Sequence, residues 1–254
     1  MYEEDAPLVE QLLAGGIDVD VVGGETATSP LHVAVDKENM PIVTMLLDAK
    51  ASVDARDCYE QTPLHYAAII DNDDFTRELL RRGAVVSAQN NEGLQPFHFA
   101  ARAGRRHNLQ LLHDQGARVD CKTFAGDTAL HFVSLLDALD ALLLLGADAS
   151  LPNNDGVTPL HCAAKCGKLD NVHALVVAPG VDVAALTGAG FSAYDMASMA
   201  MKVEVATFLQ NFKGPGTAPA EALEGVLVRP KREKGDWTPF KRKPSTLNPK
   251  PLNP

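Results

Sequence analysis

The sequence predicts an all-α solenoid of stacked antiparallel helix pairs joined by hairpin loops, followed by a disordered C-terminal tail. Three observations predict this fold: a short phrase recurs at nearly constant spacing, two apolar helical segments follow most copies, and the composition changes near residue 213. Apolar residues make up 46% and charged residues 22% of the 254, which is typical of folded proteins. Aromatic residues reach only 6%, which favours many small packing units over one large core.

The repeated phrase is a polar residue, usually a proline, an apolar residue and a histidine. Its copies are Ser29-Pro30-Leu31-His32, Thr62-Pro63-Leu64-His65, Gln95-Pro96-Phe97-His98, Thr128-Ala129-Leu130-His131 and Thr158-Pro159-Leu160-His161, with a worn copy in Ser192-Ala193-Tyr194-Asp195. The copies start 33, 33, 33, 30 and 34 residues apart. Ser or Thr before Pro predicts a helix start, because the hydroxyl caps a free backbone N–H and Pro fits the first helical position.

Each copy of the phrase opens a unit of helix, turn, helix and hairpin loop. A second apolar helix follows the first, as in Phe75 to Leu80, and closes on a Gly-Ala pair such as Gly83-Ala84. A short extended stretch then leads to the next phrase. No such unit can bury its apolar face alone, so neighbouring units must stack. We therefore expect a stack over residues 23–212, with helix starts near residues 29, 62, 95, 128, 158 and 192.

This pattern resembles the ankyrin repeat, whose phrase is a Thr-Pro-Leu-His helix start at a 33-residue period. The resemblance covers residues 1–212. It implies a curved stack of antiparallel helix pairs with finger-like hairpin loops on one side. It also implies an adaptor that carries no chemistry of its own and binds another protein, mostly through the concave face made by the fingers and the first helices.

Three units depart from the pattern. Residues 1–22 resemble a second helix without its first, so they form either a half-repeat cap or the start of a fragment of a longer protein. In the second case the stack would be a regulatory or targeting module of a larger enzyme or channel. The fourth unit lacks three residues, which predicts a shortened first helix turning near Leu136–Asp137, or alternatively one long bent helix. The last unit reads as a C-terminal cap.

The histidines and cysteines occupy positions that indicate a structural role and not a catalytic or metal-binding one. A histidine that recurs in every phrase indicates a structural role, and the family uses it to bond the helix start and the adjacent loop. Cys162 and Cys166 lie four residues apart on one helix face, but a structural zinc ion needs four ligands and no second pair completes the site. No phosphate-binding loop or catalytic motif occurs. The sequence therefore predicts no enzyme activity, no cofactor, no metal and no small-molecule substrate.

A row of aromatic residues is the candidate binding site. Tyr66, Phe99 and Phe132 follow the repeated histidine in successive units, and stacked helices lie about 8–10 Å apart, so we expect an aromatic row along the concave face. The candidate partner-binding residues, with neighbours on the fingers and the same helices, are Tyr59, Tyr66, Ile69, Leu94, Phe99, Arg102, Phe124 and Phe132. Aromatic and Arg side chains are enriched at binding hot spots. The alternative is that these side chains merely pack against their neighbours.

The charge is unevenly distributed along the chain. Lys and Arg number 23 against 33 Asp and Glu, a net charge of −10. Residues 213–254 hold nine basic and four acidic residues (+5), so residues 1–212 hold 14 against 29 (−15). The acidic stack argues against nucleic-acid binding by the repeats and favours a basic protein partner, unless most of this charge only solvates turns. No apolar run is long enough to span a membrane, and we expect a monomer.

The tail over residues 213–254 is rich in proline and is predicted to be disordered. Its basic clusters resemble nuclear-import signals and comprise Lys231, Arg232, Lys241, Arg242 and Lys243. Four cysteines make no disulfide framework, and acidic residues at the N-terminus are the reverse of a secretory signal. These features predict a cytoplasmic protein, with nuclear entry as an alternative. A further alternative is that the tail folds back on the stack and masks it.

Overall fold

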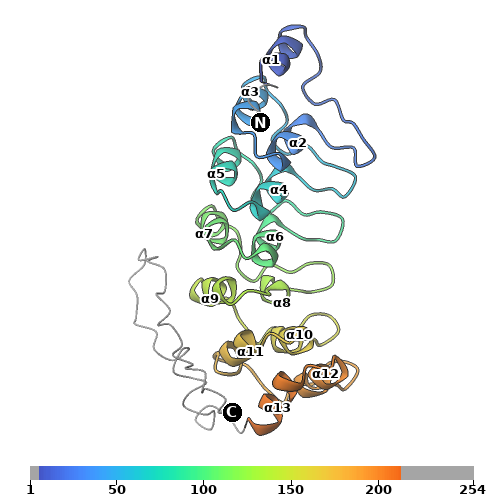
Figure 1. Ribbon diagram of the computed structural model, residues 1–254, viewed down its shortest axis with the longest axis vertical. Helices are drawn as coiled ribbons and strands as arrows, with labels where there is room; N and C mark the ends of the chain where they lie inside the picture. The colour runs from blue at the N-terminus through green and yellow to red at the C-terminus, as the bar shows by residue number, and fades with distance from the viewer. Residues whose placement is uncertain (1–5, 213–254) are drawn as a thin grey trace, which may run out of the picture. The chain divides into compact units, whose positions relative to one another are not determined.

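A computed structural model describes residues 6–212, which form thirteen helices in one elongated stack. Residues 1–5 and 213–254 lie outside the described part, and so do the predicted tail and its basic clusters. Two columns of helices run along the stack, and the fingers project from the column of first helices (Figure 1). The all-helical repeat fold predicted from the phrase is confirmed.

The first helix of each unit begins at the residue after the polar residue of the phrase. The first helices are α2 (Pro30–Asp36), α4 (Pro63–Ile69), α6 (Pro96–Ala103), α8 (Ala129–Phe132), α10 (Pro159–Cys166) and α12 (Ala193–Met199). Each preceding residue has extended backbone angles, as Thr62 does with φ −100° and ψ 164°. Proline at the first helical position needs no N–H partner, which fixes the point where the helix starts.

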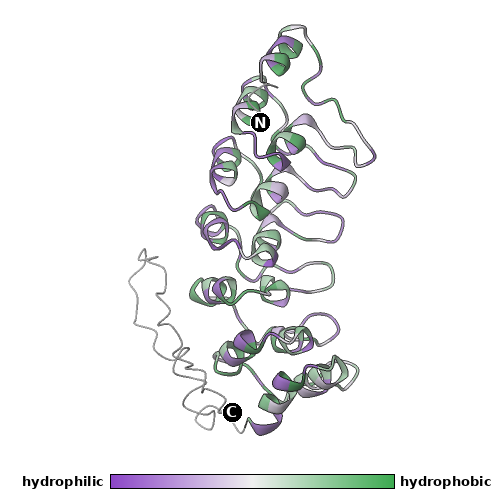
Figure 2. Cartoon of the chain, in the orientation of Figure 1, coloured by the Kyte–Doolittle hydropathy of each residue, from purple (hydrophilic) through white to green (hydrophobic). Residues whose placement is uncertain are grey.

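The second helices form the other column. They are α1 (Ala6–Ala14), α3 (Met40–Asp48), α5 (Asp74–Arg81), α7 (Arg106–Asp114), α9 (Leu136–Leu144), α11 (Leu169–Val176) and α13 (Val203–Asn211). Most helices carry hydrophobic and hydrophilic residues side by side, as short amphipathic helices do (Figure 2). None of the helices in the described part of the chain has the length and apolar character that crossing a bilayer requires.

The core is a series of small clusters, one between each pair of units. The apolar residue of the phrase is at its centre: Leu31, Leu64 and Phe97 are fully buried, and Leu160 is 1% exposed. In the sixth copy, which departs most from the phrase, the same position is Tyr194, which is 39% exposed. No helix pair follows α13 within residues 6–212, so this side chain has no neighbouring unit to cover it. The low aromatic content therefore reflects many small contacts in place of a single large core.

The fingers are joined to one another by backbone hydrogen bonds. In each unit an N–H near the finger tip donates to a carbonyl of the preceding finger. The bonds run from Cys58 to Thr26 (2.9 Å), Asn91 to Tyr59 (3.1 Å), Phe124 to Glu92 (3.1 Å), Asn154 to Ala125 (3.0 Å) and Gly188 to Asp155 (2.7 Å). This finger ladder holds the fingers at a fixed spacing, so the face that they form is built in advance of any contact.

The fourth unit has the shortened first helix that its three missing residues predict. α8 contains four residues, and Val133 after it is extended with ψ 123°. α9 starts at Leu136, so the turn lies at residues 133–135. The predicted turn near Leu136–Asp137 is therefore wrong, because those residues already belong to α9. The single bent helix is excluded.

Two first helices, α4 and α8, end in an extended residue, whereas α6 and α10 end on left-handed glycines, Gly104 and Gly167. The carbonyls left over at these two ends are bonded by asparagines on the second helix of the following unit. Asn171 Nδ2 lies 3.3 Å from the Val133 oxygen. Helix ends otherwise leave carbonyls without a partner, so an asparagine of another unit supplies the missing cap.

Asn108 caps the end of α4 in the same way, with more bonds. Its Nδ2 lies 3.2, 3.1 and 3.0 Å from the carbonyl oxygens of Ala67, Ala68 and Ile70. The side chain is 1% exposed, so water does not compete for these carbonyls. An irregular helix end in one unit is therefore repaired by an asparagine about 40 residues later.

Candidate partner-binding face

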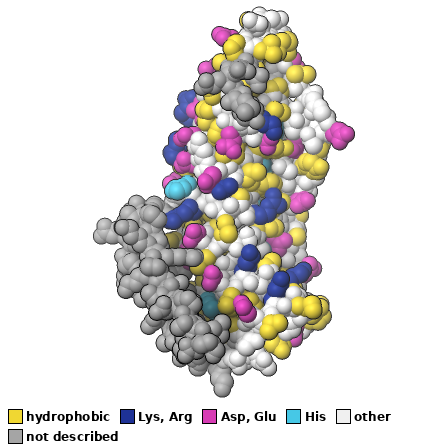
Figure 3. Space-filling model, in the orientation of Figure 1, with side chains coloured by type: hydrophobic (Ala, Val, Ile, Leu, Met, Phe, Trp, Pro, Cys, Tyr) yellow, Lys and Arg dark blue, Asp and Glu magenta, His cyan; other side chains and the backbone are white. Residues whose placement is uncertain are grey.

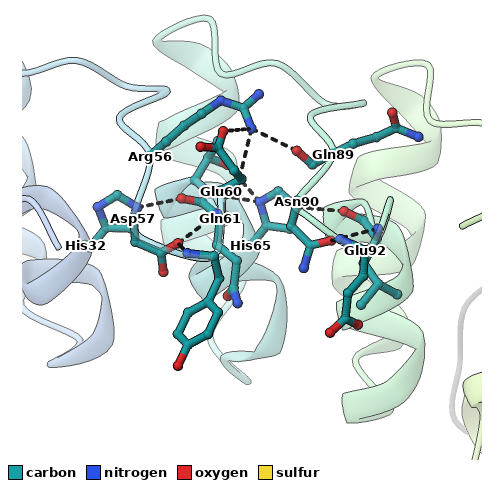
Figure 4. A network of polar contacts seen from close by, with 12 residues as sticks. His32, Arg56, Asp57, Glu60, Gln61, His65, Gln89, Asn90 and Glu92 are labelled. Atoms are coloured by element: carbon teal, nitrogen blue, oxygen red, sulfur yellow. Dashed lines mark hydrogen bonds and ion pairs between the residues drawn. The ribbon is translucent and has the colours of Figure 1, made fainter. Parts of the chain in front are cut away.

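The repeated histidines join each unit to the next. His65 Nδ1 accepts the Thr62 N–H at 3.0 Å, and Nε2 donates to the Leu94 carbonyl in the following finger at 3.1 Å. Figure 4 shows His65 between Gln61 of its own unit and Asn90 of the following finger. The other four histidines repeat both contacts. Their onward acceptors are the carbonyls of Gln61 for His32 (3.0 Å), Cys121 for His98 (3.0 Å), Val157 for His131 (3.0 Å) and Phe191 for His161 (3.2 Å).

These contacts fix the protonation state of the rings. A backbone N–H can only donate, so Nδ1 must be bare and the proton must lie on Nε2. Burial lowers the pKa of His65 to about 4, and burial likewise lowers the pKa of the other four histidines. Both nitrogens of each neutral ring are therefore engaged, which fits the structural role predicted for them.

The aromatic row lies against the histidines. Tyr66 packs edge-on against His32 with ring centroids 5.2 Å apart, Phe99 against His65 at 5.1 Å, and Phe132 against His98 at 5.9 Å. Each aromatic ring thus covers the histidine of the preceding unit. Tyr66 and Phe132 are half-buried.

Two of the candidate residues are buried. Phe99 and Leu94 are each 6% exposed, and the Leu94 carbonyl accepts the bond from His65. The packing interpretation holds for these two side chains. Both side chains are part of the core under the candidate face and are not available for contact with a partner.

The Tyr66 hydroxyl is bonded within the stack. It donates to Asp57 Oδ2 at 2.8 Å, and burial raises the pKa of Tyr66. Asp57 is 3% exposed, and its other oxygen accepts the N–H groups of Tyr59 and Gln61, which closes the finger turn (Figure 4). In the next unit Asn90 closes the turn in the same way, and the aromatic residue there is Phe99. The aromatic residue is therefore a tyrosine in the unit whose turn residue, Asp57, has a carboxylate oxygen that accepts its hydrogen bond.

We expect Tyr66→Phe to lower the free energy of unfolding by about 2 kcal/mol, because a buried carboxylate loses a hydrogen bond. The same change in an Asp57→Asn background should cost less by about 1 kcal/mol, because the double variant reproduces the Asn90 and Phe99 pair of the next unit. Urea unfolding followed by circular dichroism measures all four proteins. Strictly additive effects of the two substitutions would contradict the pairing.

The exposed candidates gather on the fingers and the first helices. Tyr59 and Phe124, at finger tips, are 50% and 65% exposed, and Ile69 on α4 is 40% exposed. Arg102 on α6 is exposed, and its guanidinium carbon lies 4.8 Å from the centroid of the Phe99 ring. On the visible face of the stack, hydrophobic side chains are interspersed with acidic and basic ones (Figure 3).

Sequence reasoning missed two exposed residues of this face, Leu135 and Lys165. Leu135 is 52% exposed. Both stand seven residues after the polar residue that opens their unit, as do Ile69 and Arg102. This shared register position is the signal that would have found them.

Many acidic residues have a structural task. Asp20 accepts the Ser52 N–H at 2.9 Å, Asp54 accepts the Val85 N–H at 3.0 Å, and Asp120 accepts the Asp148 N–H at 3.1 Å. In each case a carboxylate of one unit holds the backbone of the next. The negative charge of the stack is therefore partly a consequence of how its units are joined.

The cysteines are free thiols. Burial raises the pKa of Cys121 and of Cys162 to about 12, which keeps both protonated at neutral pH. Within residues 6–212 no three His, Cys, Asp or Glu side chains gather in a group that could hold a metal ion.

Helix pairs that contact their sequence neighbours, joined by fingers on one side, define a solenoid repeat protein. The chain belongs to the ankyrin-repeat family: the family described as ankyrin repeats (3 copies) matches residues 1–90 and again residues 97–187. Ankyrin repeats are generally protein–protein interaction modules, and they are typically non-catalytic. The family resemblance drawn from the repeated phrase is thus confirmed.

Proposed function

We propose that this protein is an adaptor that binds a protein partner through the face made by its fingers and first helices, which corresponds to the concave face of the family. The observation that carries the proposal is the set of large side chains exposed there: Tyr59, Phe124, Ile69 and Arg102. Exposed aromatic and Arg side chains on a rigid support are typical of binding hot spots. The proposal requires no cofactor and no catalytic step.

The support beneath these side chains is fixed before binding. The finger ladder and the onward histidine bonds tie each finger to its neighbour, so little conformational freedom is lost when a partner docks. Pre-organisation of this kind raises affinity by lowering the entropic cost of association.

The charge sign of the partner remains a prediction, as do the monomeric state and the cytoplasmic location. The described residues include 14 basic and 26 acidic side chains, which favours attraction of a basic partner from a distance. Three of these carboxylates hold backbone N–H groups of the next unit. The net charge is therefore expected to affect the rate at which a partner associates more than the contacts in the bound complex.

The test is a pair of matched double variants. We expect Tyr59→Ser with Phe124→Ser to abolish capture of the partner while leaving the unfolding midpoint nearly unchanged, because both side chains are exposed and fill no core space. The control is Val85→Ser with Leu144→Ser, which removes apolar side chains 49% and 60% exposed at other positions of the stack. Proximity labelling with quantitative mass spectrometry compares both variants with the unmodified chain.

Partners retained by the control and lost by the first variant support the proposed face. Equal retention by both variants would show that the partner binds elsewhere on the stack.

A further inference from the structure

Four exposed residues recur at one register position in successive units: Ile69, Arg102 and Lys165 lie on α4, α6 and α10, and Leu135 lies between α8 and α9. Each stands seven residues after the polar residue that opens its unit. The row alternates between an apolar and a basic side chain over four consecutive units, in a stack whose net charge is negative. We call it the basic–apolar row.

The charge of Arg102 is oriented but not paired. Its guanidinium lies over the Phe99 ring, and a ring face attracts a cation without neutralising it. Five other arginines form ion pairs with carboxylates of the stack: Arg56, Arg77, Arg81, Arg82 and Arg105. Within residues 6–212 Arg102 forms none, and neither does Lys165. Both charges are therefore available to a ligand.

Apolar side chains stand on both sides of Arg102. Ile69 occupies the same position in the preceding unit. Leu135 of the following unit packs directly over Gly104, two residues beyond Arg102, where an added Cβ would collide with it. A carboxylate that reaches Arg102 thus meets a cation flanked by apolar surface, where screening by water is weaker than on an open surface.

Resting on the proposed function, we infer that the partner presents an extended segment with a carboxylate that pairs with Arg102, apolar side chains that cover Leu135, and a second carboxylate near Lys165. Stacked units are about 10 Å apart, so Arg102 and Lys165 are separated by about 20 Å. An extended chain covers that distance in about six residues. The recognition element is therefore acidic and apolar, whatever the charge of the rest of the partner.

The experiment uses a display library of random 12-residue peptides selected on the full chain. The best peptide is then synthesised, and its affinity is measured by fluorescence anisotropy. We expect selected peptides to carry Asp or Glu, and replacement of that residue by its amide to weaken binding about tenfold. On an Arg102→Gln variant the same peptide change should weaken binding less than about twofold, because the paired charge is already gone.

Arg118→Gln is the matched control, since Arg118 is also exposed and forms no ion pair within residues 6–212. It should leave the tenfold effect intact. Equal effects of Arg102→Gln and Arg118→Gln, selected peptides that lack acidic residues, or a library that yields no binder would each overturn the inference.

A further variant separates this inference from the proposed function. If capture of the partner is lost with Tyr59→Ser and Phe124→Ser but is unaffected by Arg102→Gln, the proposed face of fingers and first helices is correct and the acidic recognition element is wrong. If the partner is retained by the Tyr59→Ser and Phe124→Ser variant but Arg102→Gln still removes the effect of the peptide carboxylate, the acidic recognition element is correct and the proposed finger contacts are wrong.

Discussion

Lowering the pH from 7.5 to 5 is expected to destabilise the stack steeply. The pKa of folded His65 is about 4 against an ordinary value of 6.5, and the other four repeated histidines shift in the same direction. Below pH 6.5 the unfolded chain therefore binds more protons than the folded one, so stability is full above that value and falls as the pH drops toward the folded pKa. Each histidine contributes up to about 1.4 kcal/mol per pH unit in this window.

Urea unfolding midpoints between pH 7.5 and pH 5 measure the effect. Ordinary carboxylates titrate near pH 4, so the histidines account for most of the change in this window. A His65→Gln variant should be less stable at pH 7.5, because Thr62 and Leu94 lose their shared partner, but its stability should depend less steeply on pH. His107→Gln, at an exposed position of α7, is the control. A profile that is flat down to pH 5 would contradict the neutral, buried state of the histidine column.

Asn108→Ala should lower the free energy of unfolding by about 3 kcal/mol, since the buried Ala68 and Ile70 carbonyls at the end of α4 lose their donor and the Ala67 carbonyl keeps only the Ile70 N–H. Asn108→Asp should be at least as harmful, although it keeps the volume, because a carboxylate cannot donate and faces carbonyl oxygens instead. Urea unfolding gives the magnitude, and hydrogen exchange at α4 shows whether the loss is centred there.

Asn171→Ala is the matched comparison for Asn108. Its bond to the Val133 carbonyl is 3.3 Å long, so the loss should be smaller. Equal losses at the two positions would show that packing, and not the cap between units, determines the cost.

The units could be predicted from the sequence because their signals are local. A polar residue, a proline in four of the six copies, and an apolar residue lie side by side in the phrase, so helix starts follow from a few neighbouring residues. The caps of α4 and α8 could not be predicted in this way. Asn108 and Ala68 are 40 residues apart, and nothing local marks one as the partner of the other.

The position of the candidate face could be predicted from the sequence, but the exposure of its side chains could not. The row containing Tyr66 and Phe132 could be placed on the first helices from register alone. Exposure could not, because it depends on how closely neighbouring units approach: Phe99 is 6% exposed although it occupies the same register position. Leu135 is exposed because the fourth unit lacks a turn of its first helix, a tertiary effect of a three-residue deletion.

The last unit closes without a histidine. Its helix start is capped by Asp195, whose Oδ2 accepts the Ser192 hydroxyl at 2.6 Å and the Ser192 N–H at 2.9 Å. A carboxylate has no proton with which to reach a further finger, so the series of onward bonds stops there. The stack consequently has a direction. Each internal histidine donates to the finger that follows it, so its removal deletes one bond toward the C-terminal neighbour, while the backbone bonds between fingers still join the two units.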